Sequence, residues 1–146
     1  MTDSQIEAPA TTLSITYDRT QHCTAVQAPQ GKAVATDACT ATGGKGEEIS
    51  PKNLVGAGLT GCMLFSIGMV ALRDGVDLSG TRVNVEISAT EHPAARLGAI
   101  DLEFIMPGSI PESERPKLER AAELCPIHGS FHPDIPITAH FRYLGS

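Results

Sequence analysis

Four cysteines, Cys23, Cys39, Cys62 and Cys125, are the residues of this chain best suited to covalent chemistry. Cys62 lies in the middle of a long apolar segment, where burial would raise its pKa and where a cysteine is most often a small buried hydrophobe. Cys23 and Cys39 lie in or beside segments with strand patterns, and we expect both to be inert packing thiols. Taken alone, the position of Cys62 leaves structural and functional interpretations open.

Cys125 has a more suggestive position, because it ends a predicted helix and directly precedes Pro126. If a short helix follows over residues 126–131, its free amide groups would lie near Cys125 and favour a thiolate. Alternatively, Cys125 closes the preceding helix against the core. The residues alone do not separate these two interpretations.

Histidines near the cysteines suggest two other kinds of site, a zinc centre and a Cys–His hydrolase. Cys125, His128 and His132, together with His22-Cys23, lack a complete paired-ligand spacing, so we predict no metal site. A hydrolase would need a histidine positioned against its cysteine. His128 is the closest in sequence, and we expect it at the surface or beside the site.

The elements that must position these residues can be predicted from hydrophobic period and turn signals. Ser50-Pro51 favours a helix start, Gly75 favours its end, and apolar residues around most of the circumference predict burial nearly all round. Strands are expected over 13–17, 23–28, 32–39, 81–88, 98–106 and 134–143, and helices over 51–74 and 113–124. This order predicts an α+β domain with antiparallel sheets packed on helices.

Composition narrows the function classes. The 146 residues fit a single domain over 1–146, with 1–10 expected to be a flexible tail. A net charge of −6 without a basic run argues against nucleic acid as a partner. Glycine and hydroxyl residues interrupt the apolar run 54–72, so we expect a core helix and no membrane span. Without a signal-peptide pattern we expect a cytoplasmic protein with free thiols.

Two motifs carry a family resemblance. Residues 50–62, Ser-Pro-Lys-Asn-Leu-Val-Gly-Ala-Gly-Leu-Thr-Gly-Cys, resemble the pattern Ser-Pro-Glu-x-Leu-x-x-Ala-x-x-x-x-Cys of the OsmC/Ohr family. Residues 125–128, Cys-Pro-Ile-His, resemble its second motif, Cys-Pro-Val. The resemblance covers essentially the whole chain. It implies an OsmC-like α+β fold with a long central helix, in an intertwined homodimer with two sites at the interface.

The resemblance also implies a mechanism. Cys62 would attack an organic hydroperoxide and become a sulfenic acid, and Cys125 would resolve it as a disulfide. A lipoyl or thioredoxin-like dithiol would restore both thiols, with no metal or cofactor. Met63, Phe65 and Met69 are candidates to line the substrate pocket, although the same residues could be core side chains.

The charged residues of the family site are less well matched. In family peroxidases an Arg near the first turn of the chain stabilises the thiolate. Arg19 has that location, because it lies in the predicted turn after the first strand. The Glu that should follow Ser-Pro is replaced by Lys52, with Glu47 and Glu48 as possible substitutes. Two alternative functions therefore stay open, a non-catalytic protein that binds a small apolar ligand at the dimer interface, and a redox sensor.

Overall fold

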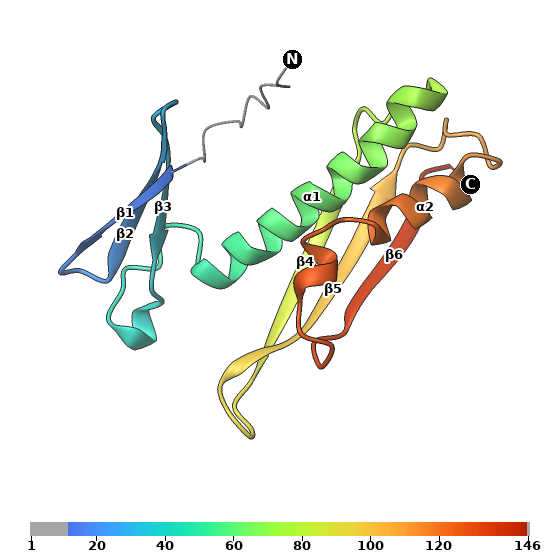
Figure 1. Ribbon diagram of the computed structural model, residues 1–146. Helices are drawn as coiled ribbons and strands as arrows, with labels where there is room; N and C mark the ends of the chain where they lie inside the picture. The colour runs from blue at the N-terminus through green and yellow to red at the C-terminus, as the bar shows by residue number, and fades with distance from the viewer. Residues whose placement is uncertain (1–11, 146) are drawn as a thin grey trace, which may run out of the picture. The chain divides into compact units, whose positions relative to one another are not determined.

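The computed structural model describes residues 12–145, which fall into two compact units (Figure 1). The first unit ends at Pro51 and the second begins at Lys52. The predicted tail, residues 1–10, lies outside the described residues.

The N-terminal unit is a three-stranded antiparallel sheet. Its strands are β1 (Thr12–Asp18), β2 (His22–Ala28) and β3 (Lys32–Asp37), followed by the 3-10 turn η1 (Thr40–Thr42). The β1–β2 turn requires a left-handed residue, Gln21, at φ 57°. One sheet face carries Leu13, Ile15 and Tyr17, each about 60% exposed. The predicted meander is therefore confirmed, and it leaves an apolar face uncovered within the unit.

A buried carboxylate organises the loop after this sheet. Asp37 is 4% exposed, and its Oδ1 lies 2.6 Å from Nδ1 of His22. Its other oxygen, Oδ2, accepts hydrogen bonds of 3.1 Å from the backbone N–H groups of Glu47 and Glu48. The hydrogen bond from His22 lowers the pKa of Asp37, while Asp37 raises the pKa of His22. Asp37 thus joins two strands to the segment that leads into the long helix.

The C-terminal unit places two helices on one face of a second three-stranded sheet. Helix α1 (Pro51–Asp74) is followed by β4 (Arg82–Thr90) and β5 (Arg96–Met106). Helix α2 (Arg115–Glu123), the 3-10 turn η2 (His128–Ser130) and β6 (Ile137–Tyr143) complete the unit. The predicted α1 bounds are confirmed, because proline at the start and glycine after the end are strong local signals.

The expectation of purely antiparallel sheets is wrong for the last strand. β4 and β5 pair antiparallel, but β6 pairs with β5 in parallel, with Ile100 opposite Ile137. The physical reason is the connection. Helix α2 crosses over the sheet between the two strands, so the chain re-enters β6 from the same end as β5.

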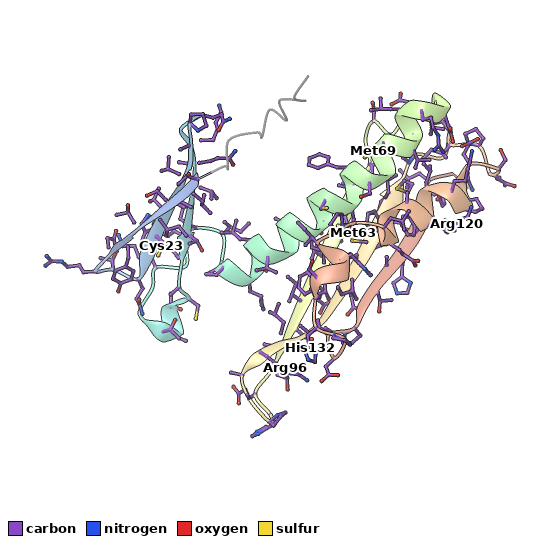
Figure 2. All side chains as sticks on the ribbon, viewed as in Figure 1. Cys23, Met63, Met69, Arg96, Arg120 and His132 are labelled. Atoms are coloured by element: carbon purple, nitrogen blue, oxygen red, sulfur yellow. The ribbon has the colours of Figure 1, made fainter. Side chains whose placement is uncertain are left out.

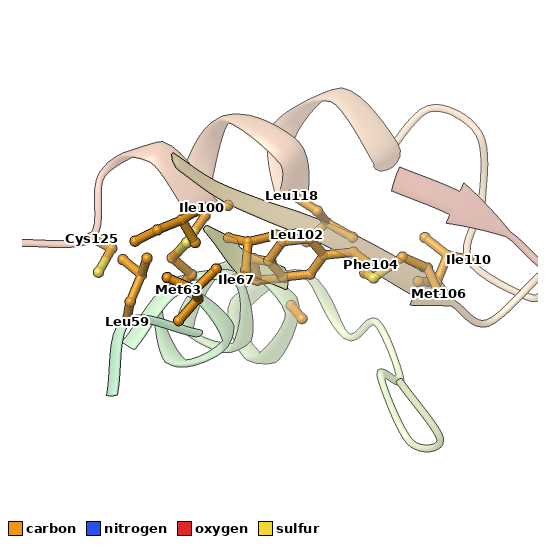
Figure 3. Close-up of a cluster of buried hydrophobic side chains, with 13 residues drawn as sticks. Leu59, Met63, Ile67, Ile100, Leu102, Phe104, Met106, Ile110, Leu118 and Cys125 are labelled. Carbon is orange, nitrogen blue, oxygen red and sulfur yellow. The ribbon is translucent and has the colours of Figure 1, made fainter. Parts of the chain in front are cut away.

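The core of this unit lies between the sheet and both helices (Figure 3). Phe104 of β5 is fully buried and stacks on Phe141 of β6, with ring centroids 4.6 Å apart. Alternate residues along β5 face the helices, as expected for a strand with one covered face. Thirteen residues form the cluster, namely Leu59, Met63, Ile67, Ala71, Ile87, Ile100, Leu102, Phe104, Met106, Ile110, Leu118, Ala122 and Cys125.

Helix α1 is buried on one side only, so the expectation of burial nearly all round is wrong within the described unit. Phe65, Met69 and Leu72 are 77%, 74% and 85% exposed. The buried side packs so closely on β4 that a Cβ added at Gly56 would lie 2.6 Å from Cδ1 of Ile87. By length and composition, α1 is also the one helix among residues 12–145 that could cross a bilayer, a test that core helices pass as well.

Candidate active site

Cys62 lies in the middle of α1, at the border between its buried and exposed sides. Its side chain is half-buried and packs against the core cluster. One turn later, the Ser66 hydroxyl donates a 3.1 Å hydrogen bond to the Cys62 carbonyl. Because the helix fixes the backbone here, Cys62 presents its thiol from a rigid element.

Cys125 is held in a tight turn directly after α2. Only 1% of its surface is exposed. Its backbone N–H donates to the Ala122 carbonyl at 3.4 Å, and its own carbonyl accepts from the Gly129 N–H at 3.2 Å. The backbone N–H of His128 donates a 3.4 Å hydrogen bond to the Cys125 Sγ. The predicted helix over 126–131 is only the short turn η2, but one of its amides does reach this sulfur.

The fold brings the two motif cysteines together, although 63 residues separate them in the sequence. Burial raises the pKa of Cys125, and the neighbouring Cys62 side chain raises it further. The backbone N–H groups of His128 and Ile127 act in the opposite direction. Both cysteines are free thiols here. Two interacting thiols, one buried and one half-buried, are a pair that can alternate between dithiol and disulfide.

The three predicted pocket residues point in different directions. Met63 is fully buried in the core, whereas Met69 is exposed on another side of α1 (Figure 2). Phe65 is exposed as well. Met63 also borders a cavity of about 300 Å³ between α2, η2 and β6, whose rim carries Arg120 and His128. Within this unit the three residues therefore do not line a common pocket, and their role in substrate binding stays a prediction.

The charged residues considered for the site are divided between the two units: Arg19, Glu47 and Glu48 belong to the N-terminal unit, and Lys52 begins the C-terminal unit. Arg19 is exposed in the β1–β2 turn of the N-terminal unit, and its catalytic role stays a prediction. Lys52 is exposed in the first turn of α1. Glu47 and Glu48 have exposed side chains, and their backbone amides are bound to Asp37.

Cys39 differs from the expected packing thiol, because it is exposed just after β3. Its Sγ lies 3.4 Å from the Thr42 hydroxyl, and this contact lowers the pKa of Cys39. The sequence contained a signal for this, since a hydroxyl residue three positions after a cysteine in a turn can reach its sulfur. Cys23 is half-buried in β2.

The His22–Asp37 pair was not predicted from the sequence, because it depends on the register of β2 and β3. No sequence pattern marks these two residues, because their contact arises from strand pairing. Among residues 12–145, no three His, Cys, Asp or Glu side chains are arranged to hold a metal ion.

The chain is similar to known proteins over most of its length. The family model for OsmC-like proteins matches residues 44–140. A Psychrobacter arcticus protein assigned to osmotic stress and detoxification has a similar structure, with 27% identity, a TM-score of 0.84, and coverage of 90% of this chain and 95% of the other.

Two further structures share the fold at lower identity. The OsmC-like protein of Mycoplasma pneumoniae is 16% identical with a TM-score of 0.77, covering 91% of this chain and 96% of the other. The organic hydroperoxide resistance protein OhrB of Bacillus subtilis is 15% identical with a TM-score of 0.66, covering 90% and 97%. No curated protein matches the sequence. The family match and the shared fold confirm the predicted resemblance: this chain belongs to the OsmC-like protein family.

Proposed function

We propose that this protein is a thiol peroxidase that reduces organic hydroperoxides. The observation that carries the proposal is that the half-buried Cys62 packs against the buried cluster that contains Cys125. A peroxidase of this type needs one thiolate to attack the peroxide and a second thiol close enough to resolve the product. Cys62 is assigned the first role because it is the less buried of the two, and Cys125 the second.

The reaction balances in three steps. The Cys62 thiolate attacks the outer peroxide oxygen, the O–O bond breaks, and the alkoxide takes up a proton to leave as an alcohol. The Cys125 sulfur then attacks the Cys62 sulfenic acid, forming the disulfide and releasing water. An external dithiol reduces that disulfide by exchange and is itself oxidised to a disulfide.

The character of α1 supports an organic substrate. Phe65 and Met69 expose apolar surface on the turns that follow Cys62. An apolar approach to the sulfur favours an alkyl or aryl hydroperoxide over hydrogen peroxide, because only the organic substrate gains from leaving water. The similar structures include proteins named for organic hydroperoxide resistance, which agrees with this substrate class.

We also propose that the exposed side of α1 is covered by a second copy of the chain. Two rows of apolar residues follow this side of α1 at a spacing of seven residues. The first row is Val55, Cys62 and Met69, and the second is Phe65 and Leu72; together they form the α1 stripe. This is the spacing of a helix–helix seam. The homodimer would act in a reducing cytosol, where a dithiol can regenerate the enzyme.

The test is intact mass spectrometry of the reduced protein after one equivalent of cumene hydroperoxide. We expect the loss of two hydrogens, mapped by peptide analysis to a Cys62–Cys125 disulfide. Cys62→Ser should abolish that loss, and Cys39→Ser, which removes an exposed thiol outside the pair, should leave it intact. Thiols that stay reduced in folded wild-type protein would overturn the peroxidase proposal and favour a protein that binds a small apolar ligand.

A further inference from the structure

Helix α2 carries five charged side chains, and three of them are held by contacts within the protein. The guanidinium group of Arg115 donates hydrogen bonds to two backbone carbonyls in the loop before the helix. The ammonium group of Lys117 lies 2.7 Å from a carboxylate oxygen of Asp74. Glu119 accepts a 2.9 Å hydrogen bond from the hydroxyl of Tyr143. These three charges therefore stabilise the fold and are not available to a ligand.

The other two charged side chains of α2, Arg120 and Glu123, have no ion-pair partner among residues 12–145. They are three positions apart, which places their Cβ atoms about 5–6 Å from each other on one side of the helix. The favourable order along a helix puts the acidic residue first, and here the basic residue comes first. Both side chains are exposed, so a ligand can reach both charges without breaking a contact of the fold.

Both of these charged side chains line the cavity of about 300 Å³ between α2, η2 and β6. Its floor is apolar, because Met63 is fully buried, and Ile137 and Phe141 pack against the core cluster. The half-buried His128 adds a ring nitrogen to the rim. An apolar floor with a few polar groups around it is the usual construction of a small-molecule site.

We propose that this cavity binds a small apolar amino acid as its zwitterion. The carboxylate of the ligand pairs with Arg120, its ammonium group pairs with Glu123, and its side chain lies on the apolar floor. A ligand with only one charge would leave the other charge of the rim beside its apolar body without a partner, which costs free energy. The cavity volume is at the lower end of the range of about 300–1,000 Å³ for small-molecule sites, which fits an amino acid better than a nucleotide cofactor.

The proposed site does not use the two motif cysteines. Neither Cys62 nor Cys125 lines the cavity, although Met63 directly follows Cys62 and the backbone N–H of His128 is bonded to the Cys125 sulfur. No step of the binding involves a thiol. The proposal is therefore independent of the peroxidase function.

The test is a titration of the isotope-labelled, reduced protein with L-leucine, followed through the amide chemical shifts in NMR spectra. We expect saturable shifts at Arg120, His128 and Ala139, which come from the three elements around the cavity. Two analogues separate the two charges, since isocaproate is leucine without its ammonium group and isoamylamine is leucine without its carboxylate. Each analogue loses one charge-assisted contact and should bind at least about tenfold more weakly than leucine.

Two variants assign the charges to their residues. Arg120→Met and Glu123→Gln each remove one charge and keep a side chain of similar length, and each should weaken leucine binding at least about tenfold. Both residues are exposed, so both variants should fold, and the spectra without ligand check this. Arg142→Met is the matched control, because Arg142 pairs with Glu103 at 3.2 Å and does not line the cavity. The control should bind leucine like the wild type.

Three outcomes would overturn the proposal. The first is the absence of any saturable shift with leucine up to about 10 mM in wild-type protein. The second is equal affinity for leucine and either analogue, which would exclude a zwitterionic ligand. The third is unchanged leucine binding in both variants, which would exclude the two charges as its partners. No peroxide enters this experiment, so its failure is distinct from a failure of the peroxidase function.

Discussion

Phe65→Ala tests whether the exposed side of α1 is a dimer interface. A phenylalanine side chain buries about 150–250 Å² when covered, and Phe65 leaves 77% of its surface exposed in the single chain. The dimer would cover this remaining surface, on the order of 150 Å². Truncation to alanine would lose most of that buried area, which weakens the free energy of dimerisation by about 3 kcal/mol per copy at roughly 25 cal/mol per Å². A symmetric dimer contains the residue twice, so the dissociation constant should rise about ten-thousand-fold.

The dissociation constant can be measured by sedimentation of the reduced protein over a dilution series. Leu124→Ala is the matched control, because Leu124 is 79% exposed but lies at the end of α2, outside the α1 stripe. We expect the control to dissociate like the wild type and Phe65→Ala to be a folded monomer at micromolar concentration. A Phe65→Ala protein that stays dimeric with unchanged affinity would refute the assignment of this side of α1 as the interface.

Three further predictions concern stability. Gly56→Ala should lower the free energy of unfolding by about 1–3 kcal/mol, because the new Cβ meets Ile87 of β4. Gly68→Ala, whose new Cβ meets nothing within 4 Å, should raise the free energy of unfolding by about 1 kcal/mol. Denaturant titration at equal protein concentration compares the two variants. Hydrogen bonds from Arg73 and Lys117 hold the pKa of Asp74 well below its usual range, so this contact stabilises the fold above about pH 4 and is lost as the pH falls towards the folded pKa. Lys117→Met should therefore lower the unfolding free energy at pH 7, and its difference from wild type should narrow between pH 5 and pH 2; a constant difference would contradict the ion pair. Asp37→Ala should speed amide hydrogen exchange at Glu47 and Glu48, and Asp18→Ala, at the exposed end of β1, should leave both rates unchanged.

Local signals predicted most of the elements but not all of their pairing. Helix α1 was predictable because Ser50-Pro51 and Gly75 act on their own backbone, without help from the rest of the chain. The parallel pairing of β6 with β5 was not, because it depends on how α2 crosses the sheet. The exposed side of α1 was missed for a related reason. An apolar helix that is covered by a partner has the same sequence pattern as one that is buried in its own chain.

In the candidate site, too, some features follow from local sequence and others depend on distant parts of the chain. That Cys62 packs against the cluster containing Cys125 could be predicted only through the family motifs, since no local pattern joins residues so far apart. The direct hydrogen bond from His128 to the Cys125 sulfur needed the structure, because it depends on the conformation of the turn after α2. The lowered pKa of Cys39 is the opposite case, because its cause, Thr42, lies three residues away.

The long sequence separation of the two sulfurs has a consequence for the protein during its synthesis. Cys62 is made 63 residues before Cys125, which at 5–20 residues per second is roughly 3–13 s. In that interval the Cys125 thiol does not yet exist on the ribosome-bound chain. A Cys62 sulfenic acid formed then would find, among the four cysteines, only Cys23 and Cys39 already made. Until residue 125 has been translated, a disulfide of Cys62 within the growing chain can therefore form only with Cys23 or Cys39.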